Sequence, residues 1–317
     1  MATGDKYPVL MASQLGSANG PAQLNSSAVL PVIQGGTEEG STQQAIYNIG
    51  CGARSNLLNN WDFTNPINQN GETQYVDLAS NQICIDRWFA PFASNHTNVS
   101  LSSQGVSIGH SDGSRYGWLK QNLENELQEG ETYSISVLTS DGYLKTINGV
   151  ASSGGSFRVY LDSQNNYVKI SGLSSIDIVA YTTITLSAIK VEIGSNQTLA
   201  YQDSGSAYHL LPQPYRNELN LCQEYQLVTK NTEYTRANYI TTNTIYFSLP
   251  APATLQSNPT FSGTMQVFDF SSGSTQTGFT FSCYAYPGEI HIVATKTSHG
   301  LTDATLLIPP GVFDSNI

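Results

Sequence analysis

Short runs of alternating apolar and polar residues, each bounded by turn-forming residues, constrain the fold of this chain most strongly. The clearest run, Thr132–Thr139, alternates for eight residues, as expected of a strand with two different faces. Comparable runs recur about every 8–12 residues, a spacing that favours β-sandwiches over an α/β fold. We therefore predict an all-β protein with two jelly-roll-like β-sandwich domains, an extended N-terminal segment and a short connecting helix.

The predicted strands fall into two groups along the chain. The first group comprises residues 99–102, 105–109, 132–139, 157–161, 167–170, 176–181 and 185–194. The second group comprises residues 239–242, 244–249, 264–270, 279–286, 290–295 and 304–308. Within the first group, Leu119, Leu123 and Leu127 recur every four residues, which predicts a short helix within residues 116–127 that ends at Gly130.

The stretch from Asn59 to Phe89 predicts the opening strands of the first sandwich. It holds Trp61 and Trp88 near its two ends, and each indole can bury about 150–250 Å². The pairs Asn65-Pro66 and Asn70-Gly71 are typical of turns. We therefore expect both indoles in the core of this sandwich.

The length of 317 residues suggests two domains, at roughly 100–200 residues each. Pro212 and Pro214 stand where a helix begins, and Leu219, Cys222 and Tyr225 follow on one helical face. The predicted organisation is an extended anchoring segment and linker (1–57), a jelly-roll domain (58–205), a helical connector (206–230) and a C-terminal β-sandwich (231–317).

Charge and hydropathy argue against nucleic acid and membrane partners, and the cysteine spacing indicates free thiols. The net charge of −11 opposes binding to phosphates, so we expect no nucleic acid partner. No run of about 18 apolar residues exists and the N-terminus lacks a secretory pattern, so we expect no membrane partner. The cysteines are far apart in sequence, which predicts free thiols in a chain made in a reducing cytosol. They are Cys51, Cys84, Cys222 and Cys283.

The segment from Gly16 to Pro31 resembles the N-terminal segments of tailed-phage fibre proteins. Those segments carry the pattern G-x-x-x-G-x-A-x-L-(N/D)-S-x-x-x-L-P, which this segment matches, although Ala28-Val29 replaces the usual Gly-Lys. The resemblance implies that residues 1–57 anchor the chain in a virus particle. Apolar residues in this segment are single or paired, so it cannot build a core by itself.

Residues 56–201 are similar to a domain found in structural proteins of phages and prophages of Gram-positive gut bacteria. The matching phrases are NLLNNWDFTNPINQNG, LENELQEGETYSISVLTSDG and AIKVEIGSNQTLAYQ. Their plan is similar to that of carbohydrate-binding modules with a jelly-roll fold. Two further phrases resemble the same phage proteins: Glu218, Leu219, Cys222, Gln223 and Tyr225 in the connector, and residues 294–306 near the C-terminus.

Few residues favour catalysis. The five histidines have no metal-type spacing, and no Gly-x-Ser-x-Gly elbow is present. Glu124, Glu126, Glu129 and Glu131 are interpreted as a solvated face, not as an acid/base pair. We therefore expect no enzymatic activity.

Sugar binding is the favoured function, because aromatic rings stack on the apolar faces of pyranoses and tyrosine tolerates partial exposure. The candidate glycan contacts are Tyr116, Trp118, Tyr143, Tyr160, Tyr167, Tyr284 and Tyr286. No cofactor or metal is expected, although Asp141, Asp162 and Asp177 offer oxygen ligands for calcium as an alternative.

The resemblance implies a phage virion structural protein, made in the cytoplasm of its bacterial host. We expect a homotrimeric head or tail fibre that contacts other virion proteins through residues 1–57 and host surface glycans through its β domains. Two alternatives stay open: a phage glycan-degrading enzyme, and a decoration or adaptor protein without a ligand.

Overall fold

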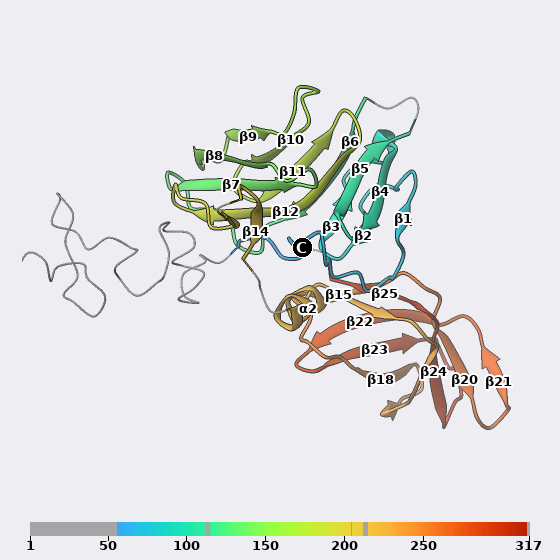
Figure 1. Cartoon of the computed structure of the whole chain (residues 1–317). Helices are drawn as coiled ribbons and strands as arrows, with labels where there is room; N and C mark the ends of the chain where they lie inside the picture. The colour runs from blue at the N-terminus through green and yellow to red at the C-terminus, as the bar shows by residue number, and fades with distance from the viewer. Residues whose placement is uncertain (1–55, 112–114, 204, 212–214, 316–317) are drawn as a thin grey trace, which may run out of the picture. The chain divides into compact units, whose positions relative to one another are not determined.

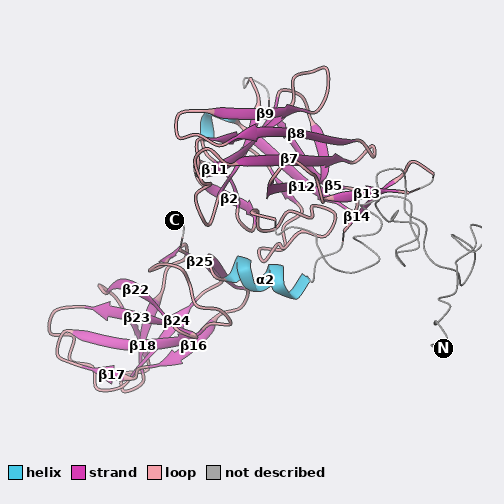
Figure 2. Ribbon diagram, turned by 90° about the vertical axis from the view of Figure 1, so that its left-hand side faces the viewer, coloured by secondary structure: helices cyan, strands magenta, loops and turns pink. Residues whose placement is uncertain are grey.

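The computed structural model describes residues 56–111, 115–203, 205–211 and 215–315. These residues form two compact units, one of residues 196–211 and one of residues 56–195 together with 215–315. Figure 2 shows mostly strand, and α2 (Tyr215–Gln223) is the single α-helix of the described residues. The predicted all-β fold with a short connecting helix is confirmed. The segment 1–57 lies almost entirely outside the described residues, and the predicted domain boundaries stay predictions.

Two six-stranded antiparallel sheets make up the first sandwich and lie as two layers in Figure 1. Sheet A has the order β1 (Gln74–Tyr75), β4 (Thr97–Ser102), β5 (Gly105–His110), β12 (Ile184–Ile193), β7 (Thr132–Thr139), β8 (Leu144–Val150). Sheet B has the order β2 (Gln82–Ile85), β3 (Trp88–Ala90), β6 (Gly117–Asn122), β11 (Ser175–Ala180), β10 (Tyr167–Ser171), β9 (Ser156–Tyr160).

The core of this sandwich follows from the alternation of its strands. On β6, Leu119 is fully buried, while Trp118 and Lys120 beside it are partly exposed. On β10, Val168 and Ile170 are fully buried in the same way. Burying one such side chain contributes about 1.5–3 kcal/mol, so a slip of one residue would be costly and the register is fixed.

Both tryptophans of the opening stretch are buried, as predicted, but Trp61 does not lie on a strand. The Trp88 ring packs edge-on against Phe63 with centroids 5.4 Å apart, and its Nε1 donates to the carbonyl of Asn60 at 3.0 Å. The Asn60 side chain donates to the carbonyls of Ile67 and Asp86 and accepts from the amide of Ile67. These side-chain bonds hold the turns of this segment, and Trp61 and Phe63 also exchange backbone hydrogen bonds with Ile189 and Ser187 of β12.

The predicted helix within residues 116–127 is wrong, because residues 117–122 form strand β6. Leu123 and Leu127 lie in the loop that follows, and their amides donate to the carbonyls of Ser174 and Leu173. The inward position after Leu119 is taken by Gln121, whose side chain bonds both backbone groups of Asn59. A polar residue at a buried position hid the two-residue period, so only the four-residue spacing of the leucines was visible.

Three smaller antiparallel sheets follow α2. Sheet D has the order β15 (Gln226–Thr229), β25 (Gly311–Asp314), β19 (Thr260–Phe261). Sheet E has the order β16 (Glu233–Arg236), β24 (Ala304–Ile308), β20 (Gln266–Asp269), β21 (Ser274–Gln276). Sheet F has the order β17 (Tyr239–Ile240), β18 (Thr244–Pro250), β23 (Glu289–Thr295), β22 (Thr280–Tyr286).

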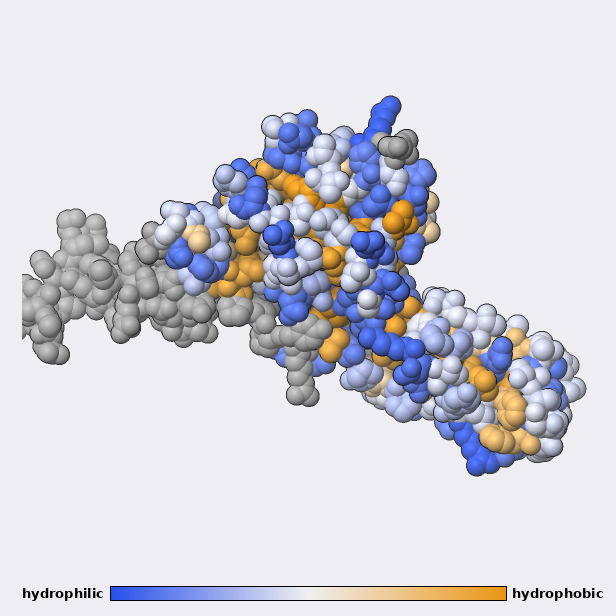
Figure 3. Space-filling model, turned by 45° about the vertical axis from the view of Figure 1, so that its right-hand side comes forward, coloured by the Kyte–Doolittle hydropathy of each residue, from blue (hydrophilic) through white to orange (hydrophobic). Residues whose placement is uncertain are grey.

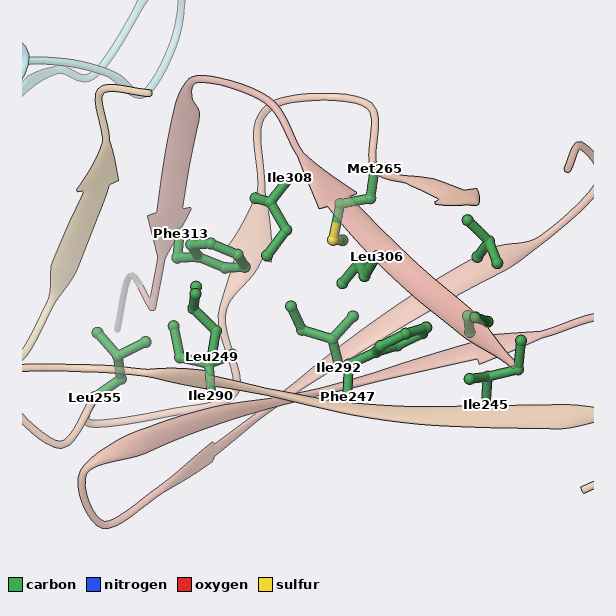
Figure 4. Close-up of a cluster of buried hydrophobic side chains, with 13 residues drawn as sticks. Ile245, Phe247, Leu249, Leu255, Met265, Ile290, Ile292, Leu306, Ile308 and Phe313 are labelled. Carbon is green, nitrogen blue, oxygen red and sulfur yellow. The ribbon is translucent and has the colours of Figure 1, made fainter. Parts of the chain in front are cut away.

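A single apolar cluster holds these sheets together. Figure 4 shows Phe313 and Ile308 on one side of it, facing Leu249 and Ile292 on the other. Ile308 and Ile292 are fully buried, so this cluster is a closed core.

The unit formed by residues 196–211 contains a small hairpin, sheet C, made of β13 (Ala200–Gln202) and β14 (Tyr208–Leu210). The Asp203 carboxylate accepts from the amides of Gly205 and Ala207 in its turn, and lies 2.8 Å from His209 Nε2. These hydrogen bonds hold the pKa of Asp203 below its usual range, with the His209 bond contributing most.

Candidate functional site

The outer side of sheet B carries aromatic side chains on neighbouring strands. Tyr160 on β9 is paired with Tyr167 on β10. Tyr167 is paired with Val179 on β11, and Val179 with Trp118 on β6. Paired residues point to the same side of a sheet, so these side chains form one row across four strands. At about 4.8 Å per strand the row spans about 14 Å, which is longer than a single sugar ring.

Further rings extend this row into a continuous surface. Phe92 follows β3 and contacts Trp118, while Tyr116 contacts both Trp118 and Tyr181. Neighbouring ring centroids are 5.4–6.4 Å apart, in edge-on or tilted arrangements that are favourable for aromatic pairs. We call this set the aromatic face: Phe92, Tyr116, Trp118, Tyr160, Tyr167 and Tyr181.

Three rings of the aromatic face are open to solvent. Phe92 is 51% exposed, Tyr160 52% and Tyr181 41%. Trp118, Tyr116 and Tyr167 are partly exposed and lie between them. Burial raises the pKa of Tyr167, so its hydroxyl stays protonated and can donate a hydrogen bond at neutral pH.

A buried carboxylate holds the indole of Trp118 in place. Asp177 of β11 is 1% exposed although it points to the outer side of the sheet. Trp118 Nε1 donates to its Oδ1 at 3.0 Å, and the hydroxyl of Ser171 donates to its Oδ2 at 2.5 Å. Lys169 Nζ lies 3.5 Å from the same Oδ2. Both carboxylate oxygens are therefore engaged inside the protein, and the ring of Trp118 has a fixed orientation.

A second row, parallel to the aromatic one, is charged. Arg158 of β9 is paired with Lys169 of β10, Lys169 with Asp177 of β11, and Asp177 with Lys120 of β6. Lys169 Nζ lies 5.6 Å from the centroid of the Trp118 ring, within reach of a cation–π interaction. Rings and cations therefore occupy neighbouring positions on this side of sheet B.

The structure brings together four of the seven predicted glycan contacts and separates the other three. Tyr116, Trp118, Tyr160 and Tyr167 belong to the aromatic face. Tyr143 lies in the turn between β7 and β8 of sheet A, is 62% exposed, and has the Lys145 Nζ 5.8 Å from its ring centroid.

Tyr284 and Tyr286 lie on β22 of sheet F, in a different cluster. The Tyr286 ring stacks on His291 with centroids 4.1 Å apart, and His291 Nε2 lies 2.7 Å from Glu289 Oε1. This bond holds the pKa of Glu289 below its usual range.

On the side of the molecule drawn in Figure 3, hydrophobic residues form separate patches among hydrophilic ones, as expected for a surface with few charges.

Sequence reasoning missed two residues of the aromatic face. Tyr181 could have been found, because Asp177, Val179 and Tyr181 are alternate positions and therefore share one side of the predicted strand 176–181. Phe92 had no such signal. Its position depends on the 3₁₀ turn η3 (Ala93–Asn95) that follows it, and on the contact with Trp118.

The alternative calcium ligands are engaged separately. Asp141 accepts from the hydroxyl of Thr139 in the β7–β8 turn, and Asp177 is held by Trp118 and Ser171. Asp162 bonds the amide of Asn166 in the turn after β9. Among the described residues, no group of three His, Cys, Asp or Glu side chains is placed to hold a metal ion.

A second group of perturbed titratable residues is buried around the β2–β3 turn. Burial raises the pKa of Asp86 to about 6, although the backbone and side-chain amides of Gln69 both donate to its carboxylate. The guanidinium of Arg87 lies 3.4 Å from the centroid of the Tyr225 ring, and burial lowers its pKa. Asp86 is fully buried, so its carboxyl is not accessible to a ligand.

The described residues also contain a cavity in the C-terminal sheets and three free thiols. A cavity of about 690 Å³ in the C-terminal sheets is lined by Phe261, Phe279 and Phe281 with threonine and glutamine side chains, and Cys283 is its one titratable lining residue. Cys84, Cys222 and Cys283 are free thiols, and Cys51 lies outside the described residues. No helix in the part of the chain that the structure describes is long and apolar enough to span a membrane.

Comparison with known proteins finds no family model, no curated protein and no solved structure that matches this chain.

Proposed function

We propose that this chain is a carbohydrate-binding structural protein without enzymatic activity, and that it forms a homotrimeric head or tail fibre of a bacteriophage particle. Binding would take place on the aromatic face of sheet B. The observation that carries this proposal is the contact of six rings across neighbouring strands, with Phe92, Tyr160 and Tyr181 open to solvent.

The chemistry of this surface suits sugars. The C–H groups of a pyranose pack against aromatic rings, while the hydroxyl groups of tyrosines bond the sugar hydroxyls. A ligand that stacks on rings already fixed in place loses less side-chain entropy than one that must order them. Trp118 is fixed by its bond to Asp177, and Tyr167 is packed between Tyr160 and Tyr181.

The assignment to a phage fibre is supported by sequence resemblance. Residues 16–31 match the N-terminal pattern of tailed-phage fibre proteins, and residues 56–201 resemble a domain of phage structural proteins. In this proposal residues 1–57 contact other virion proteins, and neither nucleic acid nor membrane is a partner. A trimer would present three aromatic faces, so weak contacts with host glycans would combine through effective concentration.

A glycan array probed with the full chain tests the binding proposal. We expect binding to oligosaccharides that are at least two or three sugars long, at micromolar to millimolar affinity. Failure to bind any glycan would favour the alternative of a decoration or adaptor protein. Release of shorter products from a bound glycan would instead favour a glycan-degrading enzyme.

Substitution of rings within and outside the aromatic face tests its location. Replacing Tyr160 or Tyr181 by Ala should weaken binding about tenfold each, because one stacked ring contributes about 1–1.5 kcal/mol. Tyr143→Ala is the matched control, since it removes an exposed tyrosine from the β7–β8 turn, outside the aromatic face, and should leave affinity unchanged. Equal losses in all three variants would contradict the proposed site. Isothermal titration calorimetry provides the affinities.

A further inference from the structure

We propose that the aromatic face selects anionic saccharides, which carry carboxylate or phosphate groups, over neutral ones. This inference rests on the proposed function and names the class of sugar that the site takes. The observation behind it is the juxtaposition of stacking rings with the cations Arg158, Lys169 and Lys120 in the next row of the same sheet.

Cations are scarce in this protein, so their position on this sheet is informative. The chain has 13 lysines and arginines in 317 residues, against 24 aspartates and glutamates. Three of those cations lie in one row beside the rings, where the only acidic residue is Asp177. A chain with a net charge of −11 therefore places a cationic row on the side of sheet B where its rings gather.

The carboxylate of Asp177 does not neutralise the whole row. Its two oxygens are taken by Trp118 Nε1, the hydroxyl of Ser171 and Lys169 Nζ. Asp162, just beyond Tyr160, accepts from the backbone amides of its own turn and from Asn166. Among the described residues, no acidic side chain lies within 4.0 Å of Arg158 or Lys120.

The geometry of Arg158 suits a sugar acid. Its guanidinium carbon lies 4.9 Å from the centroid of the Tyr167 ring, so its charge is next to a stacking surface. A guanidinium binds a carboxylate or a phosphate through two parallel hydrogen bonds. A pyranose stacked on Tyr160 or Tyr167 would bring an acidic substituent within reach of this group. Lys120, at the other end of the charged row, offers a second point charge for a longer acidic chain.

Single-stranded nucleic acid also combines stacking bases with phosphates and is the competing ligand class. Its binding relies on a long positively charged groove. Here the cationic row crosses only one sheet. The rest of the chain gives it a net charge of −11, and this negative charge would repel the parts of a long polyanion that extend beyond the row. An oligosaccharide with a few acidic groups is short enough to contact the cationic row without extending onto the negatively charged remainder of the protein.

Paired probes test the inference on the full chain. Oligogalacturonates would be compared with their methyl esters, and phosphorylated mannosides with the same mannosides after phosphatase treatment. We expect the acidic member of at least one pair to bind about tenfold or more tightly at low salt, and this preference to shrink in 0.5 M NaCl. The two pairs separate a carboxylate preference from a phosphate preference, and a dT12 oligonucleotide tests the competing class.

Two variants locate the preference. Arg158→Gln should lower the affinity for the acidic probe about fivefold to tenfold and leave the neutral probe unchanged. Lys145→Gln is the matched control, because Lys145 lies near a tyrosine ring outside the aromatic face. Near-ultraviolet circular dichroism would verify that both variants fold.

The outcomes distinguish the inference from the function on which it rests. Equal binding of acidic and neutral probes, lost in Tyr181→Ala but kept in Arg158→Gln, would overturn the anionic preference and keep the carbohydrate-binding proposal. Failure of every saccharide to bind would overturn both. Tighter binding of dT12 than of any acidic saccharide would overturn the inference in favour of nucleic acid.

Discussion

Among single residues, Asp177 shows how a polar group can organise an apolar surface. It lies on the solvent side of β11, yet it is buried by the groups that bond it, Trp118, Ser171 and Lys169. A carboxylate in this position is tolerated because both of its oxygens are hydrogen-bonded or paired. Its consequence is a rigid indole in the middle of the aromatic face.

The buried carboxyl of Asp86 predicts a stability that depends on pH. Burial raises its pKa from an ordinary value of 3.8 to about 6. Between these values the folded state keeps a proton that the unfolded chain releases, so the contribution of Asp86 to the free energy of unfolding falls as pH rises. Over this window the loss is about 3 kcal/mol, at 1.36 kcal/mol for each pKa unit.

The variant Asp86→Asn should lack this dependence. Urea unfolding at pH 4, 5, 6 and 7 should show a smaller fall in free energy for the variant than for the wild type, on top of a constant offset from altered bonds to Gln69. Asp141→Asn, at an exposed turn, is the control and should follow the wild-type curve. Parallel curves for Asp86→Asn and the wild type would show that the carboxyl titrates normally in the folded state.

At the scale of elements, the alternation of residues predicted many of the strands but missed others, such as β6 and β8, and it did not predict which strands are neighbours. The runs at 132–139 and 167–170 became β7 and β10; β10 buries one of its sides, whereas β7 is buried on both sides, including Ser134 and Ser136. The helix at 116–127 was wrong, since Gln121 occupies an inward position of β6. Tyr143 and Tyr160 look alike in sequence, and only the pairing of β9 with β10 and of β7 with β8 separates them.

The start of β6 leaves no room for a side chain at Gly117. A Cβ there would lie 2.1 Å from the carbonyl oxygen of Gly109, and neither backbone can move without disturbing its sheet. Gly117→Ala should therefore lower the free energy of unfolding by about 1–3 kcal/mol and weaken glycan binding, because Tyr116 and Trp118 flank this position.

Gly154→Ala is the control for this prediction, because a Cβ at Gly154 would meet open space. It should be neutral or slightly stabilising. Urea unfolding followed by circular dichroism measures both variants. A Gly117→Ala protein as stable as the wild type would mean that β5 and β6 are further apart at this point than the structure places them.

At the scale of the whole molecule, the sequence indicated a weakly charged all-β chain, and the aromatic face contains four of the seven residues proposed from sequence as glycan contacts. Two rings of this face, Tyr181 and Phe92, were missed. Tyr181 lies beside Tyr116 and Tyr167 because of the order of the strands in sheet B, and Phe92 is placed by the 3₁₀ turn that follows it. Composition contains neither kind of information. The proposed fibre assignment rests on the resemblance of residues 16–31 and 56–201 to phage structural proteins.

The mass of the particle in solution tests the fibre assignment. Multi-angle light scattering of the full chain should give three times the mass of one chain. A chain that lacks residues 1–57 should keep the sandwich fold, and its mass will show whether the N-terminal segment is needed for assembly. A single-chain mass for the full-length protein would remove the trimer from the proposal, while a trimer in both would place the assembly contacts in the β domains.

The distribution of the three indoles has a practical consequence. Trp61 and Trp88 are sealed in the core, at 3% and 0% exposure, whereas Trp118 is partly exposed and lies next to Phe92 and Tyr116. A water-soluble quencher such as acrylamide therefore reaches one of the three indoles, that of Trp118. This indole lies on the surface where a glycan is proposed to bind. The unmodified chain thus carries its own optical reporter for occupancy of this surface, with the two enclosed indoles as an internal reference.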